Sequence, residues 1–140
     1  TLVCPVREPV GCLTSLLSLR SLYNDLTPEF VETVCSEYVA WMDAIRESDA
    51  IIAEFARFTA DPRSTLAEVG YRIGKDPVAI RPSILRANLE TAATSAEAVI
   101  DPHSGCAPRT LPDSHKTARA ALLKHPSLLL AQAAYASAVD

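Results

Sequence analysis

The residue types in this chain that could hold a metal ion are its cysteines and histidines. Zinc sites in proteins use four thiolate or imidazole ligands, which are usually delivered as closely spaced pairs along the chain. His103 and Cys106 form one such pair. No second pair of histidine or cysteine residues stands at comparable spacing, since His115, Cys4 and Cys12 lie farther apart. The sequence therefore predicts no metal site.

Catalytic patterns are also missing. A nucleophilic Ser or Cys needs a base and an orienting acid, and the strand-turn-helix elbow that presents such a serine does not occur here. The carboxylates of Glu37, Asp43 and Glu47 are expected on the solvent side of a helix. The stretch 70–75 is one residue too short for a phosphate-binding loop, and Asp76 stands where a Mg²⁺-binding Ser or Thr is required. We therefore expect no catalytic residues, no cofactor and a function other than catalysis.

Aromatic and thioether side chains gather in the most regular apolar stretch of the chain. Tyr38, Trp41 and Met42 lie close together there and would line a pocket for a small apolar ligand if the helices left one open. The alternative interpretation is an ordinary aromatic core. Ligand binding near these three residues is therefore kept as an alternative function.

Charge is unevenly distributed along a chain whose net charge is −4. Residues 1–56 carry 3 basic and 9 acidic side chains, whereas residues 57–86 carry 6 basic and 3 acidic ones. The basic segment makes four residues candidate contacts to nucleic acid or to a partner protein. They are Arg72, Lys75, Arg81 and Arg86. Two ordinary solvated helix faces would explain the same pattern.

Part of this segment resembles a known family. Residues 51–52, 64–66 and 78–81 (Ile-Ile, Ser-Thr-Leu and Val-Ala-Ile-Arg) are similar to the centre of the rod-shaped plant-virus coat proteins, which are four-helix subunits that stack helically on RNA. The resemblance implies that Arg81 lies on a helix facing RNA or a neighbouring subunit. It covers about thirty residues, and the region before it is short for the two helices that the family places first. No family is assigned, and a coat-like subunit that contacts nucleic acid through residues 57–86 stands as a further alternative.

The elements that would position these side chains are helices. Apolar residues recur at intervals of three and four from Cys12 to Leu26, which predicts a helix. Thr27, Pro28 and Glu29 form a strong start for a second one, with a capping hydroxyl, a proline in the first turn and an acidic residue. Its apolar stripe runs to residue 45 and resumes at 51–58.

Later helices are predicted at four places. One runs from Ser64 to Ile73, with Gly74 as the residue that stops it. The next begins at Pro82. Two more run from Ser114 to Lys124 and from residue 127 onward. Residues 1–11 are expected to form an irregular arm and residues 101–114 a long loop. The predicted fold is all-α, a single-domain bundle of five to six helices over residues 1–140.

Two of the predicted helices have apolar faces suited to contact with a partner. Leu85, Leu89, Ala92 and Ala96 repeat at four-three-four spacing, and small residues there allow close helix approach. The last helix, which includes Leu128 and Leu129, has almost no polar side. Self-association would bury this apolar surface. The leading hypothesis is a non-enzymatic helical interaction or assembly subunit that forms a homo-oligomer.

The cysteines leave the cellular compartment open. Cys4, Cys12, Cys35 and Cys106 are compatible with a disulfide between the first two or with four reduced thiols. Cys35 lies in an apolar stripe, where a free cysteine behaves as a small hydrophobic residue. No charged region followed by an apolar one opens the sequence, so no secretory signal is expected, and no apolar run approaches the roughly 20 residues that span a bilayer. No membrane span is therefore expected.

Overall fold

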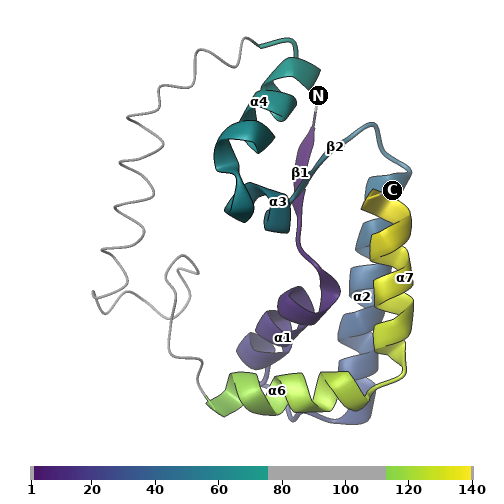
Figure 1. Cartoon of the computed structure of the whole chain (residues 1–140). Coiled ribbons are helices and arrows are strands. Elements are labelled where there is room, and N and C mark those ends of the chain that lie inside the picture. The colour runs from purple at the N-terminus through teal and green to yellow at the C-terminus, as the bar shows by residue number, and fades with distance from the viewer. Residues whose placement is uncertain (1, 76–112, 140) are drawn as a thin grey trace.

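The computed structural model describes residues 2–75 and 113–139. Within these ranges the chain is largely helical, as predicted, but it also contains a small parallel sheet (Figure 1). The elements are β1 (Val3–Val6), α1 (Pro9–Arg20), α2 (Pro28–Arg46), β2 (Ile51–Glu54), α3 (Phe55–Ala60), α4 (Pro62–Arg72), α6 (Asp113–Lys124) and α7 (Ser127–Val139).

The two strands are the main departure from the predicted all-α fold. β1 pairs in parallel with β2, so that Val3 lies opposite Ile51 and Val6 lies opposite Glu54. The prediction of an irregular arm over residues 1–11 and of a resumed helix at residue 51 was therefore wrong. A short apolar run cannot be assigned to a strand or a helix from its spacing alone, and each of these strands has only four residues.

Helix α1 begins and ends earlier than the apolar spacing indicated. Pro9 occupies the first turn, and the Glu8 carboxylate caps the helix by accepting a hydrogen bond from the Gly11 amide at 2.6 Å. The helix ends at Arg20, a turn follows over residues 21–23, and Asp25 and Leu26 lie in irregular structure. Proline at the first position and a side-chain cap explain why the helix starts before Cys12.

Helix α2 starts where the sequence predicted. The Thr27 hydroxyl accepts a hydrogen bond from the Phe30 amide at 3.2 Å, and Pro28 is the first helical residue. The buried face of α2 follows the apolar stripe. Its buried residues are Val31, Val34, Cys35, Tyr38, Met42 and Ile45.

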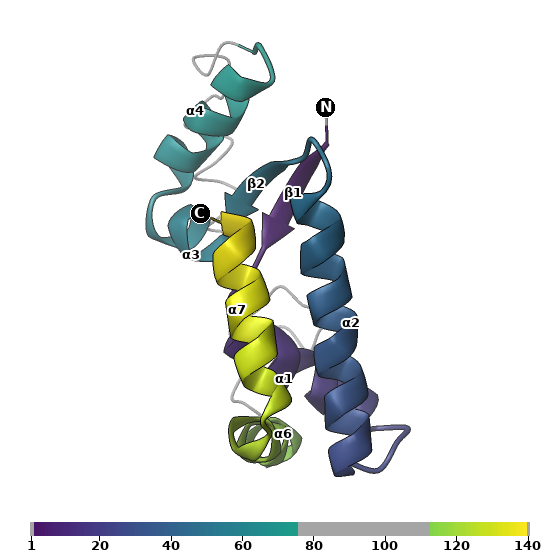
Figure 2. The ribbon, with the colours of Figure 1, turned by 90° about the vertical axis from the view of Figure 1, so that its right-hand side faces the viewer.

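One core joins the two ends of the described chain. α7 lies alongside α2, and α6 packs against α1 (Figure 2). The strand residue Val6 completes this core from the sheet side. The buried apolar side chains of the core are Val6, Leu13, Leu17, Val31, Val34, Cys35, Tyr38, Met42, Ile45, Ala118, Leu122, Leu128 and Ala131.

The remaining two helices, α3 and α4, pack against β2 beside the core (Figures 1 and 2). Asp61 separates them, and its carboxylate caps α4 by accepting a hydrogen bond from the Ser64 amide at 3.0 Å. Gly74 has a φ of +68° just beyond α4, which confirms the predicted glycine stop. The predicted helix from Pro82 and most of the 101–114 loop lie outside the described residues, and α6 already begins at Asp113.

No helix within residues 2–75 and 113–139 is both long and apolar enough to cross a membrane.

Candidate functional site

Of the three residues predicted to line a ligand pocket, Tyr38 and Met42 belong to the packed helical core. Met42 is completely buried and Tyr38 almost completely. Trp41 lies at the edge of the core, 39% exposed, and its ring meets the Tyr38 ring edge to face at a centroid distance of 6.0 Å. Both pockets described below are lined by other residues.

The titratable groups in this core are held in their neutral forms. Burial raises the pKa of Tyr38, whose hydroxyl donates a hydrogen bond to the Arg7 carbonyl at 2.8 Å. Burial also raises the pKa of the Cys12 and Cys35 thiols. A nucleophilic cysteine is favoured by a lowered pKa, so burial works against thiolate formation at both thiols.

Of the four basic candidates, the structure describes two. Arg72 is the last residue of α4, and Lys75 follows Gly74, so both lie near the carboxyl end of the helix, and both are exposed. Positive charge is favourable at that end of a helix whether or not a ligand is present. Arg81 and Arg86 lie outside the described residues, and contact with nucleic acid stays a prediction.

Of the six candidate self-association residues, the structure also describes two, Leu128 and Leu129. Leu128 is buried against the core, whereas Leu129 is 69% exposed. The sequence grouped these two neighbours on one contact surface, but in the structure Leu128 faces the core and Leu129 faces outward. Leu85, Leu89, Ala92 and Ala96 lie outside the described residues.

Much of the exposed side of α7 is apolar, although the polar residues Gln132 and Ser137 are also exposed there. Leu129, Leu130, Ala133 and Ala136 are exposed, and Leu130 reaches 65%. We call these four residues the α7 outer face. The 13 residues of α7 include no Asp, Glu, Lys or Arg. A helix that buries one apolar side and exposes another is unusual for a surface helix, which normally carries charge on its outer side.

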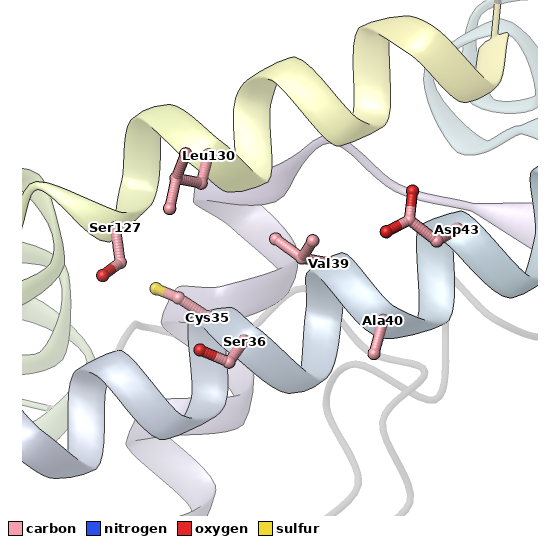
Figure 3. A pocket seen from close by; sticks show the side chains of 7 residues that line it. All are labelled: Cys35, Ser36, Val39, Ala40, Asp43, Ser127 and Leu130. Carbon is pink, nitrogen blue, oxygen red and sulfur yellow. The ribbon is translucent and has the colours of Figure 1, made fainter.

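A shallow hollow of about 230 Å³ lies next to this face, between α2 and α7 (Figure 3). The side chains that line it are Cys35, Ser36, Val39, Ala40 and Asp43 from α2, and Ser127 and Leu130 from α7. We call it the α2–α7 hollow. Asp43 is the charged residue among them, and its carboxylate pairs with the Arg46 guanidinium at 3.1 Å. Arg46 in turn donates a hydrogen bond to the Ser137 hydroxyl of α7 at 3.3 Å.

A second cavity, of about 300 Å³, lies beside the sheet. We call it the sheet pocket. Its lining residues are Val3 and Pro5 from β1, Ala53 from β2, Phe55 and Phe58 from α3, and Thr65, Leu66 and Val69 from α4. This pocket could not be predicted from the sequence, because two of its walls are strands that the residue pattern did not indicate. The sequence did contain one signal for it, an apolar pair at i and i+3 on each helix. These pairs are Phe55 and Phe58 on α3, and Leu66 and Val69 on α4.

No three residues of the types His, Cys, Asp and Glu come together as metal ligands in the part of the chain that the structure describes. Cys4, Cys12 and Cys35 are free thiols, so the disulfide considered between Cys4 and Cys12 is not formed. His103 and Cys106 lie outside the described residues.

Comparison of the chain with protein-family models, with curated proteins and with solved structures finds no match.

Proposed function

We propose that this protein is a helical assembly subunit that binds a second copy of itself through the α7 outer face and the adjoining α2–α7 hollow. The observation that carries the proposal is the exposure of Leu129 and Leu130 on a helix without charged residues. Burying one leucine side chain contributes about 1.5–3 kcal/mol. Two leucines in each copy therefore provide a substantial driving force for association.

The charges around the contact favour a copy of the same chain as the partner. The α7 outer face carries no charge, and the Asp43 carboxylate in the hollow is already neutralised by Arg46. Two such surfaces do not repel each other when they meet. A surface of this kind is suited to a two-fold contact, in which the same patch is used by both copies.

The shape of the surface is also compatible with close contact. Ser36 and Ala40 on α2, with Ala133 and Ala136 on α7, are exposed and small, so they let the backbone of a second helix approach. Leu130 projects at the edge of the hollow, between α7 and α2 (Figure 3). In a two-fold contact, a leucine of one copy enters the hollow of the other.

The proposal is tested by the solution mass of wild-type protein and of Leu129→Asp, measured by light scattering. Wild type is expected to exceed the single-chain mass of 15.1 kDa, because association buries the α7 outer face. Leu129→Asp places a charge on that face and is expected to reduce the mass to that of one chain. Because Leu129 is exposed, its far-UV circular dichroism should keep the helical signal.

Leu22→Asp is the matched control, since Leu22 is 59% exposed and lies outside α2 and α7. It should keep the wild-type mass. A wild-type protein that is monomeric across the accessible concentrations would refute the proposal, as would a Leu129→Asp variant that assembles like wild type.

A further inference from the structure

The region beside the sheet contains a pocket formed by other elements than those of the proposed assembly surface. The sheet pocket is formed by β1, β2, α3 and α4, none of which contributes to the α2–α7 hollow. We propose that the sheet pocket binds a small molecule with an apolar alkyl or aryl body.

The chemistry of the lining defines the class of ligand. Among the described residues that form the wall, Thr65 is the one with a polar side chain, and its hydroxyl donates to the Asp61 carbonyl at 3.0 Å. The wall therefore offers no free hydrogen-bond donor to a ligand. An alkyl or aryl group loses nothing on entering such a site, whereas a polar group would give up its hydrogen bonds to water.

The size of the pocket limits the ligand further. About 300 Å³ is at the lower end of the range of small-molecule sites, which run from about 300 to 1,000 Å³. At roughly 30 Å³ for each water-sized group, it holds on the order of ten non-hydrogen atoms. Val3 and Phe55 are partly exposed at its wall, so the pocket is open to solvent. A polar end of the ligand can stay in water there.

One aromatic ring of the wall, that of Phe55, has a contact with a residue outside the pocket. The Arg7 guanidinium lies over the Phe55 ring, 5.3 Å from its centroid. The Arg7 carbonyl accepts the hydrogen bond from Tyr38, so the same residue is also attached to α2. The contact with Arg7 restrains the Phe55 ring, and restraint before binding lowers the conformational entropy that a ligand must overcome.

Octan-1-ol is a suitable probe because it combines an alkyl body of the required size with one uncharged polar end. Isothermal titration calorimetry of the full chain with octan-1-ol is expected to give saturable binding to one site. Val69→Phe and Ala53→Leu, which fill the pocket from α4 and from β2, are each expected to weaken binding at least tenfold.

The control variants separate this site from other apolar surfaces. Ala44→Leu makes the same change as Ala53→Leu at an exposed position of α2, and it should bind octan-1-ol like wild type. Leu129→Asp should also bind like wild type, because the α7 outer face is not part of the pocket. Circular dichroism checks that each variant is folded.

Two results would overturn the inference. One is the absence of saturable binding by wild type up to the solubility of octan-1-ol. The other is wild-type affinity in both folded filling variants. Loss of binding in Leu129→Asp alone would assign the probe to the assembly surface and would likewise reject the sheet pocket.

Discussion

Two tyrosine hydroxyls connect the helical core to the segments around the sheet. Tyr38 of α2 donates to the Arg7 carbonyl, and Tyr135 of α7 donates to the Glu54 carboxylate of β2 at 3.1 Å. Both phenols are partly or wholly buried. Each phenol must be protonated to donate, so these two links depend on the un-ionised form of the side chain.

The Tyr135 link predicts a loss of stability in alkaline solution. Burial, together with the hydrogen bond to Glu54, raises the pKa of Tyr135 to about 12 from the ordinary value of 10.0. A raised pKa means that the folded state holds the proton more tightly than the unfolded state. The contribution to stability is therefore complete below about pH 10 and is lost as the pH rises towards 12.

The measurement is the free energy of unfolding in urea at several pH values between 9 and 12. Wild type should lose stability more steeply across this range than Tyr135→Phe, which has no phenol to ionise. Tyr23→Phe is the control, because Tyr23 is 79% exposed, and it should follow wild type. Parallel curves for wild type and Tyr135→Phe would contradict the role given to this hydroxyl.

At the residue scale, the sequence predicted the helical stripe but not the partners of its members. The spacing of apolar residues was enough to place Tyr38 and Met42 on the buried side of α2. It did not show that Tyr38 would bond to Arg7, since residues 1–11 were predicted to be irregular. Trp41 was assigned to the same stripe, but it lies at the edge of the buried face and is partly exposed.

At the element scale, the start of α2 rests on a local signal. The Thr27 hydroxyl satisfies the Phe30 amide, which has no carbonyl partner within the helix. Thr27→Ala removes this acceptor and is expected to lower the free energy of unfolding by about 1 kcal/mol. Urea denaturation monitored by circular dichroism measures the change.

Thr33→Ala provides the comparison for that prediction. Thr33 is exposed inside α2, and its hydroxyl donates to the Glu29 carbonyl, which belongs to the same helix. Alanine has the higher helix propensity, so this variant should be as stable as wild type or slightly more stable. Equal losses in the two variants would show that the hydroxyl of Thr27 has no special role.

The two strands could not be predicted from local sequence signals. A cap, a proline and a glycine act within a few residues, and the sequence predicted the helix boundaries at Thr27 and Gly74 from them. β1 and β2 are recognised as strands only when paired, and their pairing joins Val3 to Ile51. The sheet pocket could not be predicted for the same reason, because it depends on that pairing.

At the scale of the whole molecule, the sequence predicted an apolar last helix suited to contact with a partner. In the structure one side of α7 is buried, with Leu128 and Ala131, and another is exposed, with Leu129 and Leu130. Spacing alone could not make this division, because almost every position of the helix is apolar. It required knowing that α2 and α7 pack side by side.

If the assembly proposed above forms, thermal stability depends on protein concentration. Binding to the folded state alone stabilises it by mass action. The Tm of wild type is expected to rise with concentration in a dilution series followed by circular dichroism. The Tm of Leu129→Asp should stay constant over the same series. A wild-type Tm independent of concentration would count against association.

The core has a consequence for the timing of folding. The Ser18 and Ser114 hydroxyls, 3.1 Å apart at the contact of α1 with α6, are separated by 96 positions in the chain. Closing so long a loop has an entropic cost that must be met before the contacts stabilise the fold, which slows folding. During synthesis, α1 and α2 leave the ribosome before the helices that cover much of their apolar surface. They reach their native partners only after α6 and α7 have followed.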